Sequence, residues 1–116
     1  MPFDENIEPD AVLGILQEAD QRLIDEHHWL RGGYCLLDAI DYQRRGDTHD
    51  KACLYLAEAL PRDAVRCIAD DGTPDHEESV ISFNDHKTTV FKRPATTFKM
   101  VKGVLKRAIE ARKADL

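Results

Sequence analysis

The sequence lacks several features that would assign it to a compartment. It has no run of the roughly 18 to 20 apolar residues that a membrane-spanning helix needs. Its start, Met1-Pro2-Phe3-Asp4-Glu5, lacks the basic and then apolar layout of a signal peptide. The three cysteines, Cys35, Cys53 and Cys67, are widely spaced and form no CxxC pair, so reduced thiols are expected rather than a disulfide framework. We therefore expect a cytoplasmic location and no membrane partner.

Motifs of common enzyme classes are also missing. The chain has no Walker loop, no glycine-rich dinucleotide loop and no Gly-x-Ser-x-Gly elbow. The acidic segment 70–78, which we expect to be a loop, lacks the alternating ligand order and terminal glutamate of an EF-hand. The sequence therefore predicts no cofactor, and it favours an accessory role over catalysis.

What is present suffices for one folded domain. The 116 residues are 42% hydrophobic and 33% charged, which supports a single core with a solvated surface. Residues 1–8 are acidic and poor in apolar groups, so we expect a flexible N-terminus there. A single helical domain is expected over residues 9–113.

The net charge of −6 is unevenly distributed along the chain. Residues 87–116 hold nine Lys or Arg against two acids, whereas residues 1–86 hold seven against twenty. A basic end on an acidic body either binds an anionic partner or packs against its own acidic neighbours. We favour the internal interpretation.

Apolar residues recur at three- and four-residue steps, which predicts a mainly α fold of four to five helices around one core. Helical signals cover Pro9 to about His27, Tyr34–Arg45 with Gly46 as its stop, and a segment capped by Asp47 or Thr48 and ended by Pro61. A short helix is expected at 63–69 with Val65 and Ile68 as anchors, and a terminal helix after a Thr96 or Thr97 cap.

Residues 79–92 carry a different pattern. Val80, Ile81 and Phe83, and then residues 88–91, are mainly β-branched or aromatic, and they flank a polar segment at 84–87. This arrangement is compatible with a small β-hairpin at about 79–92.

Three short elements follow one another in an order that resembles a known protein family. The first is Trp29 followed by Gly32, and the second is Cys35-Leu36-Leu37-Asp38-Ala39-Ile40. The third is Phe83-Asn84-Asp85 followed by Thr97. Together they resemble an uncharacterised domain-of-unknown-function family of small bacterial and phage helical proteins. The resemblance implies a helical fold and a phage or mobile-element origin, and it assigns no reaction.

Cys35 is the candidate for a reactive group. Gly32-Gly33-Tyr34 is expected to place it in the first turn of a helix, where free N–H groups favour a thiolate. His27, His28 or His86 could serve as its base, and Asn84 or Asp85 could orient that base, as in a Cys-His-Asn hydrolase. A small buried apolar cysteine is the interpretation that we favour.

His49 and Cys53 are the candidate metal ligands. They lie four residues apart on a predicted helix, so they could share one ion with His76 or His86. The chain has only this one such pair and no helical His-Glu-x-x-His, so the sequence favours no metal site.

Binding candidates fall into two groups. Lys99, Lys102, Lys106 and Arg107 could contact nucleic-acid phosphates from the terminal helix. Trp29 and the pair Asn84-Asp85 could form a binding surface, although we favour a core anchor for Trp29 and a structural turn for Asn84-Asp85. We predict an accessory or protein-interaction module with a protein partner. A nucleic-acid-associated protein is the alternative, and a Cys35-dependent hydrolase is a lesser one.

Overall fold

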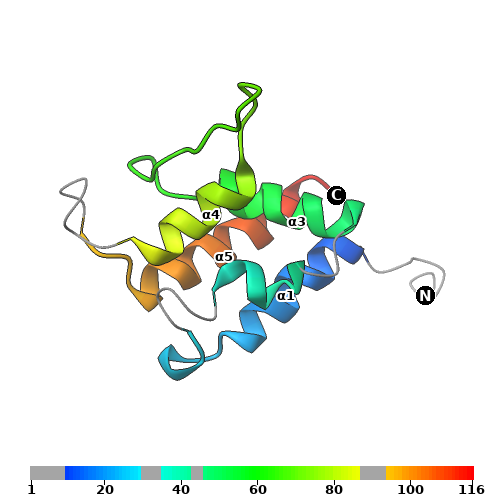
Figure 1. Ribbon diagram of the computed structural model, residues 1–116. Coiled ribbons are helices and arrows are strands. Elements are labelled where there is room, and N and C mark those ends of the chain that lie inside the picture. Colours follow the sequence, from blue (N-terminus) through cyan, green and yellow to red (C-terminus); the bar gives the residue numbers. More distant parts are fainter. Residues whose placement is uncertain (1–9, 30–34, 43–45, 87–93) are drawn as a thin grey trace, which may run out of the picture.

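A computed structural model describes residues 10–29, 35–42, 46–86 and 94–116, which form a helical bundle (Figure 1). None of the helices in these ranges is long and apolar enough to cross a membrane. The helices are α1 (Ala11–Arg22), the 3-10 helix η2 (Glu26–His28), α2 (Leu36–Ala39), α3 (Asp47–Glu58), α4 (His76–Asp85) and α5 (Phe98–Ala114). The prediction of a mainly helical fold is confirmed.

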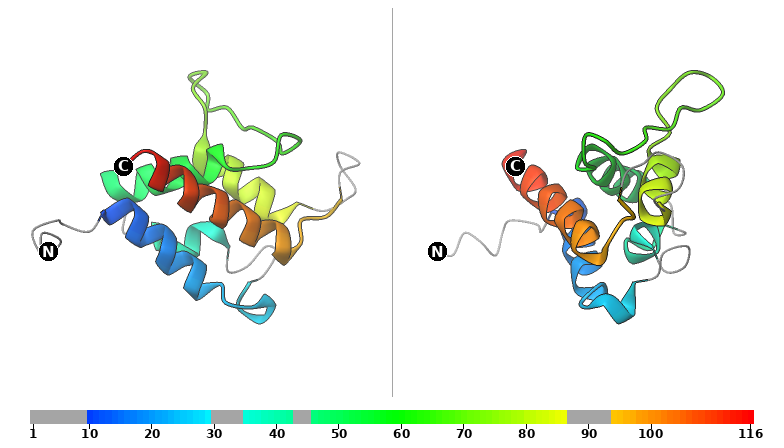
Figure 2. Two further views of the ribbon diagram at one scale, coloured as in Figure 1. Left: turned by 180° about the vertical axis from the view of Figure 1, so that it is seen from behind. Right: turned by 90° about the vertical axis from the view of Figure 1, so that its left-hand side faces the viewer.

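Helix α3 packs against α1, α4 and α5. α1 and α5 lie side by side along much of their length, and α2 packs against α1 and α4 (Figure 2). The apolar faces expected of α3 and α5 do line the core. Its fully buried large side chains include Leu16, Leu23, Leu36, Ile40, Leu56, Val80, Phe83, Val101, Val104 and Leu105.

Side-chain caps fix where the helices begin. At α1, the Asp10 carboxylate accepts a hydrogen bond from the Leu13 N–H at 2.7 Å. At α5, the Thr97 hydroxyl accepts from the Met100 N–H at 3.2 Å, and the Thr97 N–H donates to the Met100 sulfur at 3.4 Å. A thioether therefore takes the place of the usual capping-box carboxylate. Thr97 is confirmed as a cap, whereas Gly46 caps α3 and the predicted cap Asp47 is already its first residue.

Cations of α5 bind the carboxyl ends of other helices. The Lys102 ammonium donates to the carbonyls of Asp20 and Leu23 at 2.8 and 3.0 Å, at the end of α1. The Arg107 Nε–H donates to the Ala59 carbonyl at 3.0 Å, at the end of α3. The last carbonyls of a helix lack intrahelical partners and carry partial negative charge, so these cations stabilise them.

A polar cluster joins the start of α1 to the end of α5 at one end of the bundle. Arg112 of α5 makes two hydrogen bonds to the Asp10 carboxylate, at 2.6 and 2.9 Å. It also donates to the Tyr55 hydroxyl at 3.2 Å, and that hydroxyl donates to Asp115. The Arg112 hydrogen bonds lower the pKa of Asp10 to about 2. The predicted packing of the basic helix against its own acidic neighbours is observed at this cluster.

Two helices are shorter in the structure than the sequence predicted. α1 ends at Arg22 rather than near His27, and the 3-10 helix η2 follows it. The prediction of a helix over Tyr34–Arg45 is wrong beyond α2, because Asp41 has a φ of 55°, which a right-handed helix cannot continue. Residues 43–45 lie outside the described ranges.

The hairpin prediction at about 79–92 is wrong for its first half, which belongs to helix α4. The Asp75 carboxylate caps this helix by accepting from the Glu78 N–H at 2.9 Å. Ser79, Val80, Phe83 and Asn84 form its buried face, so packing overrides the β-propensity of Val80 and Phe83. The remaining part of the proposed hairpin includes residues 87–93, which lie outside the described ranges.

Candidate functional site

The segment between α3 and α4 projects from the bundle, and we call residues 61–75 the arch (Figures 1 and 2). It has no helix, so the predicted helix at 63–69 is wrong. Its upper part is ordered by its own hydrogen bonds, which form an isolated antiparallel bridge between Ile68 and Pro74 and a turn at Gly72, whose φ is +86°. The chain reverses here because the left-handed conformation is open to glycine.

The arch is also fixed to the bundle at its base. The Cys67 N–H donates to the Ser79 hydroxyl of α4 at 2.8 Å, and the Asp75 N–H donates to the Cys67 carbonyl at 2.9 Å. The Arg66 guanidinium donates to the Leu60 and Ala64 carbonyls, both at 3.2 Å. These contacts hold the arch in place beside the ends of α3 and α4.

A hollow of about 290 Å³ lies at the foot of the arch. Its apolar wall comes from Ala57 of α3 and from Ile68 and Pro74 of the arch. Ile68, predicted as an inward anchor, is 69% exposed. The hollow is also lined by Glu58, Arg66, Cys67, His76 and Ser79. The exposed isoleucine and the hollow therefore lie side by side on the surface.

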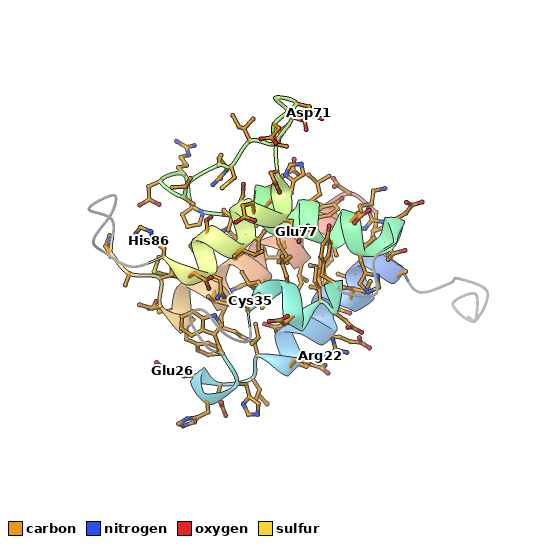
Figure 3. The ribbon with its side chains drawn as sticks, viewed as in Figure 1. Arg22, Glu26, Cys35, Asp71, Glu77 and His86 are labelled. Carbon is orange, nitrogen blue, oxygen red and sulfur yellow. The ribbon has the colours of Figure 1, made fainter. Side chains whose placement is uncertain are left out.

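The segment that forms most of this hollow is rich in acidic residues, and one of them, Glu58, lines it. Segment 58–78 contains seven Asp or Glu against two arginines. Asp71, at the tip of the arch in Figure 3, accepts from the Thr73 hydroxyl at 2.6 Å and the Thr73 N–H at 3.0 Å, and these bonds lower its pKa. Six of the seven acids form no ion pair with a cation among the described residues: Glu58, Asp63, Asp70, Asp71, Asp75 and Glu78. The arch is therefore an anionic surface with an apolar hollow at its foot.

Trp29 and Asn84, both proposed as binding residues, are buried and contact each other. The Trp29 indole N–H donates to the Asn84 side-chain oxygen at 2.6 Å, and the Asn84 amide donates to Asp85 at 3.0 Å. The Trp29 ring also packs near Phe98, with ring centroids 6.3 Å apart. Asn84 and Asp85 lie in the last turn of α4 rather than in a separate turn. Their geometry joins η2 and α4 inside the core.

His86 and Thr96 complete this junction. The Thr96 hydroxyl donates to the Phe83 carbonyl at 2.6 Å, and the Thr96 N–H donates to the His86 carbonyl at 3.2 Å. Thr96, an alternative cap for α5, is fully buried and instead binds the end of α4. The junction therefore closes the bundle where α4 ends and α5 approaches.

Cys35 does not have the surroundings of an activated thiol. It precedes the four-residue helix α2, and its N–H donates to Asp38 at 3.0 Å. Burial raises the pKa of its thiol, which opposes the thiolate that a nucleophile requires. Figure 3 shows Cys35 and His86 on separate elements, and among the described residues no hydrogen bond joins the Cys35 side chain to a histidine.

The pair His49 and Cys53 lies on α3 as predicted, but Cys53 is only 2% exposed. Burial raises the pKa of the Cys53 thiol to about 12, and Glu77, Asp50 and Asp75 add to the effect. Metal ligation requires the thiolate, so these surroundings disfavour it. Across the described ranges, no three His, Cys, Asp or Glu side chains gather closely enough to hold an ion.

The four basic residues proposed on the terminal helix separate into two groups. Lys102 and Arg107 bind carbonyls at the ends of α1 and α3, so they are occupied within the fold. Lys99 and Lys106 are exposed and make no ion pair with a described acid. Lys113, which was not among the four, lies seven residues beyond Lys106 and is also exposed.

Sequence reasoning missed Ile68 and Pro74 as surface residues of a site. Ile68 matched the spacing of a helix anchor, but it lies in an isolated bridge with Pro74 and is 69% exposed. The available signal was Gly72-Thr73-Pro74 within an acidic segment, which indicates a turn but not what the turn displays.

The profile of a family of unknown function, DUF6197, matches residues 8–111, nearly the whole chain. The chain belongs to this family. The expected membership in an uncharacterised family is thus confirmed, and the match assigns the DUF6197 chain no activity. No curated protein and no solved structure matches it. The arch and its hollow are therefore the features from which a function is argued.

Proposed function

We propose that this protein is an accessory module that binds another protein through the arch. One observation supports the proposal above all: an ordered projection displays Ile68, 69% exposed, beside an apolar hollow. Holding that segment in place reduces the entropy that binding would otherwise cost. A hollow of about 290 Å³ lies at the lower edge of small-molecule pockets and suits one or two side chains.

The proposal includes a cytoplasmic location and a phage or mobile-element origin. Three free cysteines, one of them buried, are compatible with a reducing compartment. The resemblance in the Cys35–Ile40 and Phe83–Asp85 elements supports the origin.

The test uses two isoleucines of nearly equal exposure. Ile68 is 69% exposed on the arch, and Ile24 is 68% exposed beside a second hollow near the end of α1. The wild type, Ile68→Lys and Ile24→Lys serve as baits in a lysate of the encoding organism, with nuclease and at two salt concentrations. We expect a specific protein that Ile68→Lys loses and Ile24→Lys keeps. Equal capture by all three baits would overturn the proposal.

A nucleic-acid-associated protein is the second candidate. Lys99, Lys106 and Lys113 recur every seven residues, so they share one exposed face of α5 over about 21 Å. Changing these three to Glu leaves the internal bonds of Lys102 and Arg107 intact. Salt-sensitive binding to DNA or RNA that this triple variant abolishes would support the candidate. Absence of such binding in the wild type would reject it.

A further inference from the structure

We infer that the segment that docks on the arch is a basic one, with a single aliphatic side chain between lysines or arginines. This inference rests on the proposed function and names the chemistry of the partner. The apolar wall of the hollow sets one requirement on the partner, and the acidic residues of segment 58–78 set another.

The size of the hollow sets the first requirement. Ala57, Ile68 and Pro74 provide apolar contacts, and the enclosed space is about 290 Å³. An aliphatic side chain that enters it removes its own surface and that of Ile68 from water, which favours binding. The anchor is therefore aliphatic rather than polar.

The charges set the second requirement. Glu58 lines the hollow, Glu78 lies in the first turn of α4, and Asp70 lies beside the tip of the arch. None of the three pairs with a cation in the described part of the chain. Charges within about 10 Å of one another act together at moderate ionic strength. Cations on both sides of the anchor would be attracted, and acidic flanks would be repelled.

The one arginine in the hollow does not reverse this preference. The Arg66 guanidinium donates to the Leu60 and Ala64 carbonyls, just beyond the end of α3, so its donors are directed at the backbone. These carbonyls hold it at the base of the arch. Arg66 keeps its positive charge, but the seven acids of segment 58–78 outnumber its two arginines by five, so the segment remains anionic.

Selection from a random library of twelve-residue peptides tests the inference with the full chain as bait. We expect enrichment of peptides with one Leu, Ile, Val or Met flanked on both sides by Lys or Arg. A synthetic peptide of the enriched sequence is then titrated by fluorescence anisotropy. Ile68→Lys is expected to weaken binding by about tenfold or more, and Asp70→Lys and Glu78→Lys by about threefold each.

Ile24→Lys is the matched control and is expected to change the affinity by less than about twofold. Enrichment of acidic or uncharged peptides, or no enrichment, would overturn the basic chemistry. Dimerisation of the chain that Ile68→Lys abolishes would assign the hollow to a second copy and would also overturn it. If the lysate partner still depends on Ile68, the proposed function stands while this inference fails.

Discussion

Helix α5 and the arch use their charges in opposite ways. On α5, Lys102, Arg107 and Arg112 each bind a group on a different part of the bundle, at contacts separated by 48 to 102 residues. On the arch, Asp71 binds only Thr73, two residues away, and Asp70 has no described partner. The basic residues of α5, which form the more conspicuous charge pattern in the sequence, therefore stabilise the fold. The acids of the arch remain available at the surface.

The largest loss of stability is expected from a substitution inside the bundle. Asn84→Leu leaves the Trp29 indole N–H without its described acceptor in the core, which we expect to reduce the free energy of unfolding by about 2–3 kcal/mol. Urea denaturation followed by circular dichroism, which does not depend on the single tryptophan of the chain, measures the loss in each variant. The double variant Trp29→Phe with Asn84→Leu removes donor and acceptor together and is expected to be more stable than the sum of the single changes predicts. Simple additivity would show that the bond is unimportant.

The second prediction compares the stability lost when a lysine that binds carbonyls is replaced with the stability lost when an exposed lysine is replaced. Lys102→Met removes the cation from the end of α1, and we expect a loss of about 1–2 kcal/mol. Lys99→Met, on the same helix but exposed, is expected to change stability by less than about 0.5 kcal/mol. Thermal and urea unfolding of the two variants provide the comparison. Equal losses would contradict a structural role specific to Lys102.

Two glycines sharpen the contrast between the bundle and the arch. A Cβ at Gly14 of α1 would meet no atom within 4 Å, so Gly14→Ala is expected to stabilise the protein by up to about 1 kcal/mol through helix propensity. Gly72 has a φ of +86°, so Gly72→Ala is expected to cost about 1 kcal/mol. Melting temperatures that shift in opposite directions would meet this expectation. A stabilising Gly72→Ala would show that the turn is not fixed.

The smallest expected effect is a loss of stability that appears only at low pH. The pKa of Asp10 is lowered from 3.8 to about 2, chiefly by its hydrogen bonds from Arg112. A lowered folded-state pKa means that the contribution is complete above about pH 4 and is lost as the pH falls toward 2. The urea midpoint of the wild type should therefore fall across this window. Asp10→Asn should flatten that part of the profile, and an unchanged slope would show that the pair contributes nothing.

The sequence predicted the parts of the fold that depend on local spacing. α3 and α5 have regular apolar faces and, for α5, a threonine cap, so both were identified with nearly correct limits. α4 was missed because Val80, Ile81 and Phe83 suggest a strand, and only their packing on α3 selects a helix. The end of α2 depends on the φ of Asp41, which residue spacing does not reveal.

The site was less predictable, because its contacts join distant residues. Trp29 and Asn84 lie 55 residues apart, so the sequence indicated only that a buried indole requires an acceptor. The acidic segment was correctly expected to be a loop as far as Asp75, but residue spacing did not reveal that Ile68 pairs with Pro74 and is exposed. The sequence predicted that the basic helix packs against other parts of the chain. It did not predict which carbonyls Lys102 and Arg107 bind.

The Asp10–Arg112 pair also has a mechanical consequence. Asp10 precedes α1 and Arg112 lies near the end of α5, so these antiparallel helices begin and end side by side. Tension applied to the two ends of the chain would load this ion pair first and then peel α1 from α5 one contact after another. The bundle should therefore yield in an unzipping geometry, at lower force than if all α1–α5 contacts had to shear together.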